Sequence, residues 1–141
     1  MATSKQKNKR ILLVEDHPDI VAMYKVIFEI KVKAELSVAE DKESGLKMLK
    51  DKKPDLLLLD IVIPEKKTHG LQPTARHGFE LLKELRQDKD GKDIPVIVLT
   101  NLESTRDRRE AQDYGAVDYI VKSRTLPNEV ADRVNEALEK E

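Results

Sequence analysis

Four consecutive leucines, Leu56–Leu59, stand between Asp55 and Asp60 and constrain the fold more than any other stretch. The run is much shorter than the roughly 18 residues that a membrane-spanning helix needs. It is also apolar at every position, whereas a half-exposed strand alternates apolar and polar side chains. The run therefore predicts a central parallel strand that helices cover on both faces. Such a strand brings Asp60 to the carboxyl edge of the sheet, where open α/β proteins bind ligands.

The composition fits one domain without a bulk affinity for nucleic acid or membrane. The chain has 141 residues, 39% of them apolar, which is enough for one sizeable core. Its 26 basic and 27 acidic residues nearly cancel, so neither charge dominates. Cysteine is absent, which excludes disulfides and thiolate metal sites. Residues 1–8 lack the apolar run of a signal peptide, so we expect a disordered leader on a cytoplasmic protein.

Buried-strand and amphipathic-helix patterns alternate along the rest of the chain and predict five β/α units. We expect strands at residues 11–14, near 34–38, and at 56–59, 96–99 and 119–122, each followed by a helix. Asp41 can cap the second helix, and Gly115 suits a left-handed turn after the fourth. Gly45 inside the second helix costs about 1 kcal/mol relative to alanine, which indicates close packing against a strand. Right-handed crossovers would place helices on both faces of one parallel sheet.

Four of the five predicted strands end in a charged or hydroxyl side chain, namely Glu15 with Asp16, then Asp60, Thr100 and Lys122. The carboxyl ends of parallel strands share one edge, so these side chains should meet there. Carboxylates gathered in one cleft raise one another's pKa unless a cation is present. Oxygen ligands of this kind suit Mg²⁺, while a hydroxyl and an ammonium can stabilise a transferring phosphoryl group. A strand-end cap or a surface ion pair would explain each residue alone, but explains the set poorly.

These segments resemble the receiver domain of two-component response regulators over about residues 9–140. Residues 11–16 resemble the first strand of that family with its acidic pair, and Asp60 followed by Pro64 resembles its phosphoacceptor loop. Residues 95–100 and 115–122 match its later segments. The resemblance implies a flavodoxin-like α/β fold, with a doubly wound five-stranded parallel sheet in the order 2-1-3-4-5 and five helices. We expect this receiver domain to occupy residues 9–141.

The resemblance also implies a phosphoacceptor with a metal beside it. Asp60 would take a phosphoryl group from a histidine kinase or a phosphotransfer protein. Mg²⁺ would be the cofactor, ligated by Asp16 and Asp60, with Glu15 helping directly or through water. The main-chain carbonyl of Val62 would complete the protein ligands. Such a domain catalyses only its own phosphorylation and slow dephosphorylation, and is not otherwise an enzyme.

The same resemblance implies how a phosphoryl group would be sensed. Lys122 would pair with the acceptor carboxylate and then with the phosphoryl group, while Thr100 would hydrogen-bond a phosphoryl oxygen. Tyr119 would follow Thr100 as an aromatic switch, changing the face formed by the fourth helix, fifth strand and fifth helix. That face would bind a downstream protein and allows a phosphorylation-dependent homodimer, with no nucleic acid or membrane as partner.

Two departures from the family pattern bear on the site. Ser123 follows Lys122 where the family usually has a proline in a cis bond, so the loop differs in shape or the peptide is trans. In addition, residues 78–82 resemble the usual start of the third helix but arrive about ten residues late. Residues 65–77 are therefore an insertion beside the phosphoacceptor, where they would contact a kinase or form a surface loop.

Other functions for the same fold remain open at this stage. A phosphohydrolase using an aspartyl-phosphate needs a second acid two residues after the nucleophile, where this chain has Val62. A flavin protein needs a Gly/Ser/Thr-rich phosphate loop after the first strand, which is missing. An intermediate in a phosphorelay and a non-phosphorylated pseudo-receiver scaffold are the alternatives that the sequence leaves.

Overall fold

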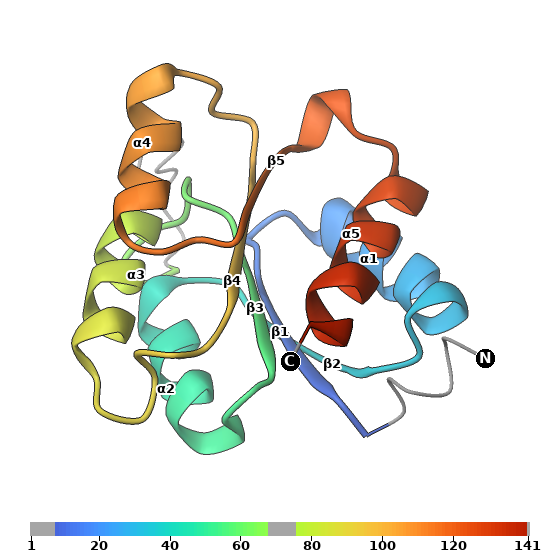
Figure 1. The fold of residues 1–141 in the computed structure, drawn as a ribbon, viewed down its shortest axis with the longest axis horizontal. Helices are drawn as coiled ribbons and strands as arrows, with labels where there is room; N and C mark the ends of the chain where they lie inside the picture. Colours follow the sequence, from blue (N-terminus) through green and yellow to red (C-terminus); the bar gives the residue numbers. More distant parts are fainter. Residues whose placement is uncertain (1–7, 68–75, 141) are drawn as a thin grey trace.

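The computed structural model describes residues 8–67 and 76–140 and contains one five-stranded parallel sheet between two helical layers (Figure 1). The strands are β1 (Arg10–Val14), β2 (Glu35–Ala39), β3 (Leu56–Leu59), β4 (Val96–Thr100) and β5 (Asp118–Val121). The helices are α1 (Pro18–Lys31), α2 (Lys42–Lys52), α3 (Gly78–Gln87), α4 (Thr105–Asp113) and α5 (Pro127–Glu139), with a short 3₁₀ turn, η2 (Lys122–Arg124), after β5. The strand order β2-β1-β3-β4-β5 confirms the predicted doubly wound topology.

Two predicted segments lie partly outside the described residues. The expected disordered leader covers residues 1–8, of which 1–7 are not described. The expected insertion covers residues 65–77, of which only 65–67 and 76–77 are described. Both stay predictions, and the insertion enters below only through its two ends.

Strand β3 lies at the centre of the sheet, as its four leucines predict. It pairs with β1 on one side and with β4 on the other. All four leucines are fully buried. Leu57 and Leu59 belong to the core on one face, and Leu56 and Leu58 to the core on the other. The apolar run is therefore explained by burial on both faces.

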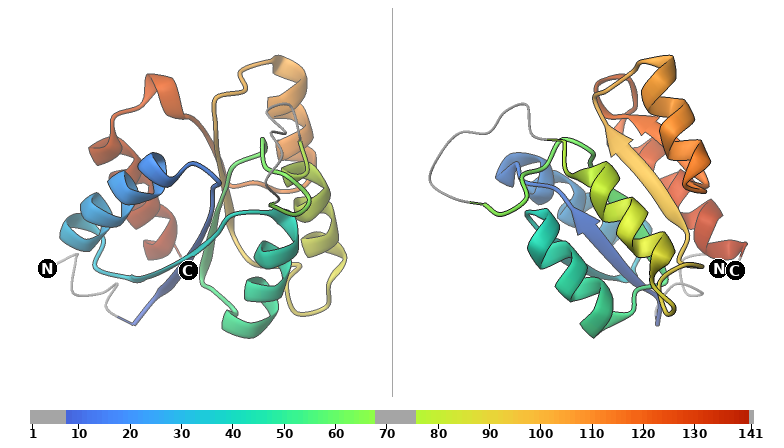
Figure 2. Two further views of the ribbon diagram at one scale, coloured as in Figure 1. Left: turned by 180° about the vertical axis from the view of Figure 1, so that it is seen from behind. Right: turned by 90° about the vertical axis from the view of Figure 1, so that its left-hand side faces the viewer.

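The two faces of the sheet are covered by different helices. Figures 1 and 2 show α2, α3 and α4 on one side of the sheet, and α1 and α5 on the other. The buried residues divide in the same way, with Phe79 and Leu82 of α3 in one core and Phe28 of α1 in the other. In the part of the chain that the structure describes, no helix has both the length and the apolar character needed to cross a membrane.

Two glycines have the structural roles that the sequence predicts for them. A β-carbon on Gly45 would lie 2.9 Å from Leu81 Cδ1 and 3.3 Å from Val14 Cγ2, so α2 packs closely on the sheet as predicted. Gly115 has a φ of 76°, the left-handed conformation predicted after α4. Helix α4 begins directly after its N-cap residue, Ser104, and ends directly before its C-cap residue, Tyr114.

Gly78 is the glycine that the site depends on most. A β-carbon there would lie 2.5 Å from Ile61 Cα and 2.6 Å from the carbonyl oxygen of Asp60. Both are main-chain atoms and cannot rotate away. We therefore expect Gly78→Ala to lower the free energy of unfolding by about 3 kcal/mol, at the upper end of the usual cost of overpacking.

Gly45→Ala is a matched control, because its new methyl would meet the flexible end of Leu81 and would gain helix propensity. Urea denaturation of both variants measures the difference. Equal stability of the two variants would show that the loop after β3 tolerates a side chain at residue 78.

Candidate functional site

Lys122 joins two buried carboxylates at the carboxyl edge of the sheet, the upper edge in Figure 1. Its Nζ donates to Glu15 Oε1 at 2.6 Å and to Asp60 Oδ2 at 2.8 Å. Glu15 is 0% exposed and Asp60 3% exposed. The ends of β1, β3 and β5 thus bring together three of the side chains predicted to meet.

Burial and mutual interaction govern the protonation of this group. Burial raises the pKa of Glu15, and the neighbouring Asp60 raises it further, while Lys122 acts in the opposite direction. For Lys122, burial alone would lower the pKa, but the charges of Asp60 and Glu15 outweigh it and raise the pKa above 10.5. Among the described residues, the ammonium of Lys122 is shared by the carboxylates of Glu15 and Asp60, so one positive charge faces two negative charges.

The turn after β3 fixes the direction of the Asp60 side chain. The Asp60 main-chain N–H donates to Val14 O at 3.0 Å, and the Val62 N–H donates to Asp60 Oδ1 at 3.1 Å. Ile61 and Ile63 are buried and anchor the turn in the core. One carboxylate oxygen of Asp60 is therefore bound to Lys122 and the other to the backbone.

The second acidic residue after β1 presents a buried oxygen. Asp16 Oδ1 accepts no hydrogen bond from residues 8–67 or 76–140. Next along the chain, His17 Nδ1 lies 3.2 Å from this oxygen and 3.2 Å from Glu15 Oε2. An unpartnered buried carboxylate oxygen beside a cluster with excess negative charge fits a divalent cation.

Thr100 and the loop after β5 close the other side of the site. Thr100 ends β4, is fully buried, and pairs in register with Val121. The Lys122–Ser123 peptide is trans, and the Ser123 N–H donates to Asn101 Oδ1 at 2.8 Å. The residue that replaces the usual proline thus ties the loop after β5 to the loop after β4.

Tyr119 connects β5 to the loop that leads into α4. Its hydroxyl donates to Leu102 O at 2.8 Å, and the Arg108 guanidinium lies 4.9 Å from the ring centroid. Burial raises the pKa of Tyr119 to about 12, with a further contribution from Asp107. The tyrosine therefore stays neutral at physiological pH and holds the β4–α4 loop by a hydrogen bond.

A comparison with family models decides what this arrangement is. The model of the response regulator receiver domain matches residues 11–135, most of the chain. The chain belongs to this family. Membership of this family is consistent with a role in two-component signalling.

Relatives of this receiver include proteins of similar length and proteins about twice as long. Protein PilH of Pseudomonas aeruginosa is 32% identical over 114 residues, which cover 80% of this chain and 84% of PilH. The probable C4-dicarboxylate response regulator DctR of Bacillus subtilis is 31% identical over 136 residues, which cover 96% of this chain and 53% of DctR. The chain thus spans about half the length of several relatives that it matches.

Solved structures support the same assignment. A CheY-like receiver domain protein from Methanospirillum hungatei has a TM-score of 0.78 at 26% identity, with 94% of this chain and 95% of that chain covered. The Mn²⁺-bound form of response regulator Rcp1 has a TM-score of 0.69 at 26% identity, with coverages of 94% and 90%. Receivers generally bind a divalent metal, and this chain has an acidic cluster directly after β1.

Asp107 is a buried residue that the sequence analysis missed. The sequence analysis gives it no role, but it is only 6% exposed. Its main-chain N–H donates to Ser104 Oγ at 3.0 Å, Ser104 Oγ donates to its Oδ2 at 2.7 Å, and Arg76 pairs with its Oδ1. The spacing of a serine and an acid three residues later is that of a capping box, which could have indicated this role.

The described ends of the insertion are bound to neighbouring loops. At its start, the Glu43 N–H donates to Glu65 O at 3.0 Å, and the Lys67 N–H donates to Asp41 Oδ2 at 2.7 Å. Lys67 Nζ also donates to the main-chain oxygen of Asp16 at 3.3 Å. At its end, Arg76 contacts α4 through Asp107. The insertion is thus linked to the acidic pair on one side and to α4 on the other.

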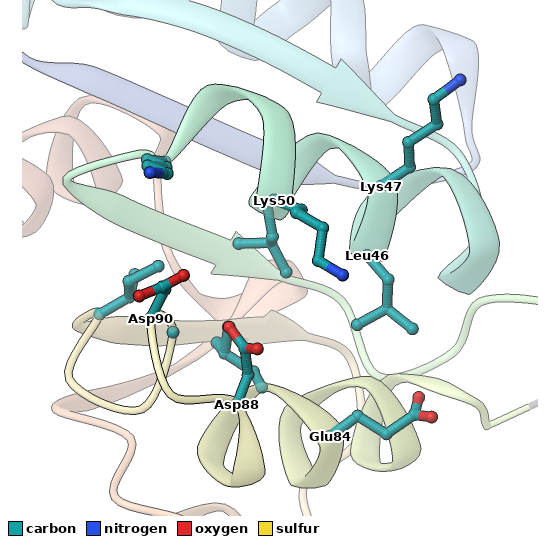
Figure 3. Close-up of a pocket in the computed structure, with 11 residues that line it drawn as sticks. Leu46, Lys47, Lys50, Glu84, Asp88 and Asp90 are labelled. Atoms are coloured by element: carbon teal, nitrogen blue, oxygen red, sulfur yellow. The ribbon is translucent and has the colours of Figure 1, made fainter.

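A cavity of about 340 Å³ lies between α2 and α3, away from these residues. Figure 3 shows Leu46, Lys47 and Lys50 of α2 on one wall, with Glu84 and Asp88 on the other. Because it is also lined by residues that precede β3 and β4, it lies toward the amino ends of the strands. None of the predicted site residues lines it.

The buried carboxylate of Glu15 should make the metal-free receiver less stable as pH rises. Its pKa is raised above 4.5, so the folded state binds this proton more tightly than the unfolded state. The resulting stabilisation is present below about pH 4.5 and is lost as pH rises through the raised pKa. Glu15→Gln is neutral at every pH, so we expect it to gain stability relative to the parent over this interval.

Urea denaturation in the presence of a metal chelator, from pH 4.5 to neutral, measures this effect. Glu29→Gln on the exposed side of α1 is the control, and its difference from the parent should stay constant. If the difference in unfolding free energy between Glu15→Gln and the parent is also constant with pH, ionisation of Glu15 does not destabilise the folded state.

Proposed function

We propose that this receiver accepts a phosphoryl group on Asp60 from a histidine kinase or a phosphotransfer protein in the cytoplasm. The observation that carries the proposal is the contact of Lys122 Nζ with the buried Asp60 carboxylate at 2.8 Å. An Asp60 oxygen attacks phosphorus, a new P–O bond forms, and the bond between phosphorus and the donor's leaving group breaks. The ammonium of Lys122 is then placed to balance the charge of the phosphoryl oxygens.

We propose Mg²⁺ as the ion that completes the site. Asp16, Asp60 and the Val62 carbonyl would hold it, with Glu15 acting directly or through water. The residues fit such an ion, because Asp16 Oδ1 is buried without a hydrogen-bond partner in the described part of the chain, and the cluster carries excess negative charge. Bound there, the ion would neutralise charge that develops on the phosphoryl oxygens.

The remaining roles concern the lifetime of the acyl phosphate. Thr100 would donate its hydroxyl to a phosphoryl oxygen. Val62 and Leu102, both half-buried, stand two residues after Asp60 and Thr100 and cannot orient a water molecule for attack. We therefore infer slow self-dephosphorylation, and no turnover of a separate substrate.

We propose that phosphorylation changes the α4-β5-α5 face. When Thr100 moves toward a phosphoryl group, the loop containing Leu102 moves with it and breaks the bond to the Tyr119 hydroxyl. Helix α4 has two buried residues, Asp107 and Ala111, so little packing opposes its shift. A downstream protein, or a second phosphorylated copy, would then bind this face.

Backbone NMR shifts on addition of beryllofluoride and Mg²⁺ test the switch. We expect changes that extend from Asp60 to residues 106–121. In Tyr119→Phe, the metal-free spectrum should already move toward the activated one, because the bond to Leu102 O is missing. Tyr114→Phe at the end of α4 is the control. Changes confined to the surroundings of Asp60 would reject the mechanism.

The class of activity is tested by incubation with acetyl phosphate and Mg²⁺, followed by the mass of the intact protein. A stable adduct of one phosphoryl group supports the receiver. Hydrolysis of acetyl phosphate without an adduct would support a phosphohydrolase. If neither an adduct nor hydrolysis is observed, the result supports a binding scaffold. Retention of the group until a phosphotransfer protein is added would favour a relay intermediate.

A further inference from the structure

His17 directs its ring at the acidic pair instead of capping the helix that it precedes. It is the N-cap residue of α1, but its side chain makes no capping hydrogen bond. Its Nδ1 lies 3.2 Å from Glu15 Oε2 and 3.2 Å from Asp16 Oδ1. Lys122 binds the other oxygen of Glu15, Oε1. The imidazole and the ammonium therefore approach Glu15 through different oxygens.

Two separations within the group of His17, Glu15 and Asp16 match those between ligand atoms around one ion. Ligand atoms bound at about 2.0–2.2 Å to one cation stand roughly 3.0–3.5 Å apart. Both separations of His17 Nδ1 from the carboxylate oxygens fall in that interval. In addition, Asp16 Oδ1 is buried and has no hydrogen-bond partner among the residues that the structure describes. The expectation of an all-oxygen ligand set left out this nitrogen.

We propose that His17 is a metal ligand and sets the preference of the site, giving it a higher affinity for Zn²⁺ than carboxylates alone would provide. The inference rests on the proposed function, because it concerns the same metal position. Imidazole nitrogen is a good ligand for Zn²⁺, whereas Mg²⁺ takes oxygen ligands and retains water. His17 thus contributes to the binding of Zn²⁺ and not to that of Mg²⁺, and Zn²⁺ competes with Mg²⁺ for the receiver.

A second group of similar composition provides an internal comparison. Glu65, His77 and Glu80 also place one ligand atom each within 4.8 Å of one another. There, however, the ammonium of Lys42 lies 3.6 Å from Glu65 and 3.4 Å from Glu80. The carboxylates of that group are also about half exposed, and among the described residues neither has a buried oxygen without a partner, so we do not assign it a metal.

The test measures affinities of the full, untagged chain for Zn²⁺ and Mg²⁺ by isothermal titration calorimetry. The chain has three histidines, so replacing His69 and His77 by alanine leaves His17 as the one imidazole. In that background, His17→Asn keeps a polar side chain of similar reach but removes the imidazole ligand. We expect it to weaken Zn²⁺ binding about tenfold, the usual minimum for loss of a group that supports a metal site. Mg²⁺ affinity should be unchanged.

The outcomes separate failure of this inference from failure of the proposed function. Equal Zn²⁺ affinity with and without His17, or equal losses for Zn²⁺ and Mg²⁺, would overturn the role of the imidazole, because a histidine that only hydrogen-bonds the carboxylates predicts such results. Asp16→Asn should weaken both ions. If Asp16→Asn leaves Mg²⁺ binding intact, the metal position itself is wrong and both proposals fall.

Discussion

A Lys122→Met variant is expected to lose about 3–5 kcal/mol of unfolding free energy at neutral pH, the usual cost of removing one partner from a buried ion pair. The lysine side chain is 9% exposed and those of Glu15 and Asp60 are 1% and 4% exposed. Without the ammonium, two carboxylates would face each other in the core with no counter-charge. Urea denaturation in the presence of a chelator measures the loss.

The loss of unfolding free energy in Lys122→Met should be smaller at acidic pH than at neutral pH. The pKa of Glu15 is raised, so acidification protonates one of the two carboxylates and relieves the repulsion. The deficit of Lys122→Met should therefore shrink as pH falls toward 4.5. In the parent, the pKa of Lys122 is raised, so its stabilisation is present below 10.5 and is lost as pH rises through the raised pKa.

Lys42→Met is the matched control for Lys122→Met. Lys42 also contacts several carboxylates, but the side chains of Glu65, Glu80 and Glu84 are about half exposed. Ion pairs with solvated partners contribute less than about 1 kcal/mol, so this variant should be close to the parent. Equal losses in the two variants would show that burial of Glu15 and Asp60 does not control the energetics of the site.

Asp60→Asn is expected to abolish phosphorylation by acetyl phosphate while preserving the fold. The amide is a poor nucleophile, and in the described part of the chain Asp60 is the one carboxylate bound by both Lys122 and the Val62 N–H. The substitution also removes repulsion with Glu15, so the metal-free variant should be as stable as the parent or slightly more stable. Intact mass and urea denaturation measure the two effects.

Asp55→Asn provides the comparison, because Asp55 flanks the same leucine run at its opposite end. There its Oδ2 accepts from the Arg10 N–H at 2.8 Å, away from Lys122. This variant should be phosphorylated to the parental extent. Unchanged labelling of Asp60→Asn, or equal loss in both variants, would contradict the assignment of the acceptor.

The fold and the centre of the site could be predicted because both follow from local patterns. Burial on both faces makes Leu56–Leu59 uniformly apolar, and parallel strands bring their carboxyl ends to one edge, so Asp60, Glu15 and Lys122 had to lie close. The strand order, in contrast, came from resemblance to the receiver family and was confirmed by the structure.

Features that depend on long-range contacts were harder to predict. Asp107 stands on a helix rich in charged residues, yet it is buried and pairs with Arg76, 31 residues earlier in the chain. The direction of the His17 ring depends on a rotamer, since the same residue at a helix N-terminus could equally have capped α1. Neither the pairing nor the rotamer has a sequence period that would reveal it.

Locating the phosphoryl group within the labelled receiver tests the central claim most directly. The protein would be incubated with acetyl phosphate and Mg²⁺, digested at acidic pH, and its peptides sequenced by tandem mass spectrometry. The account predicts a single modified residue, Asp60, at the end of β3. Modification of another residue, such as Asp16 or Asp55, with Asp60 left unmodified, would contradict it.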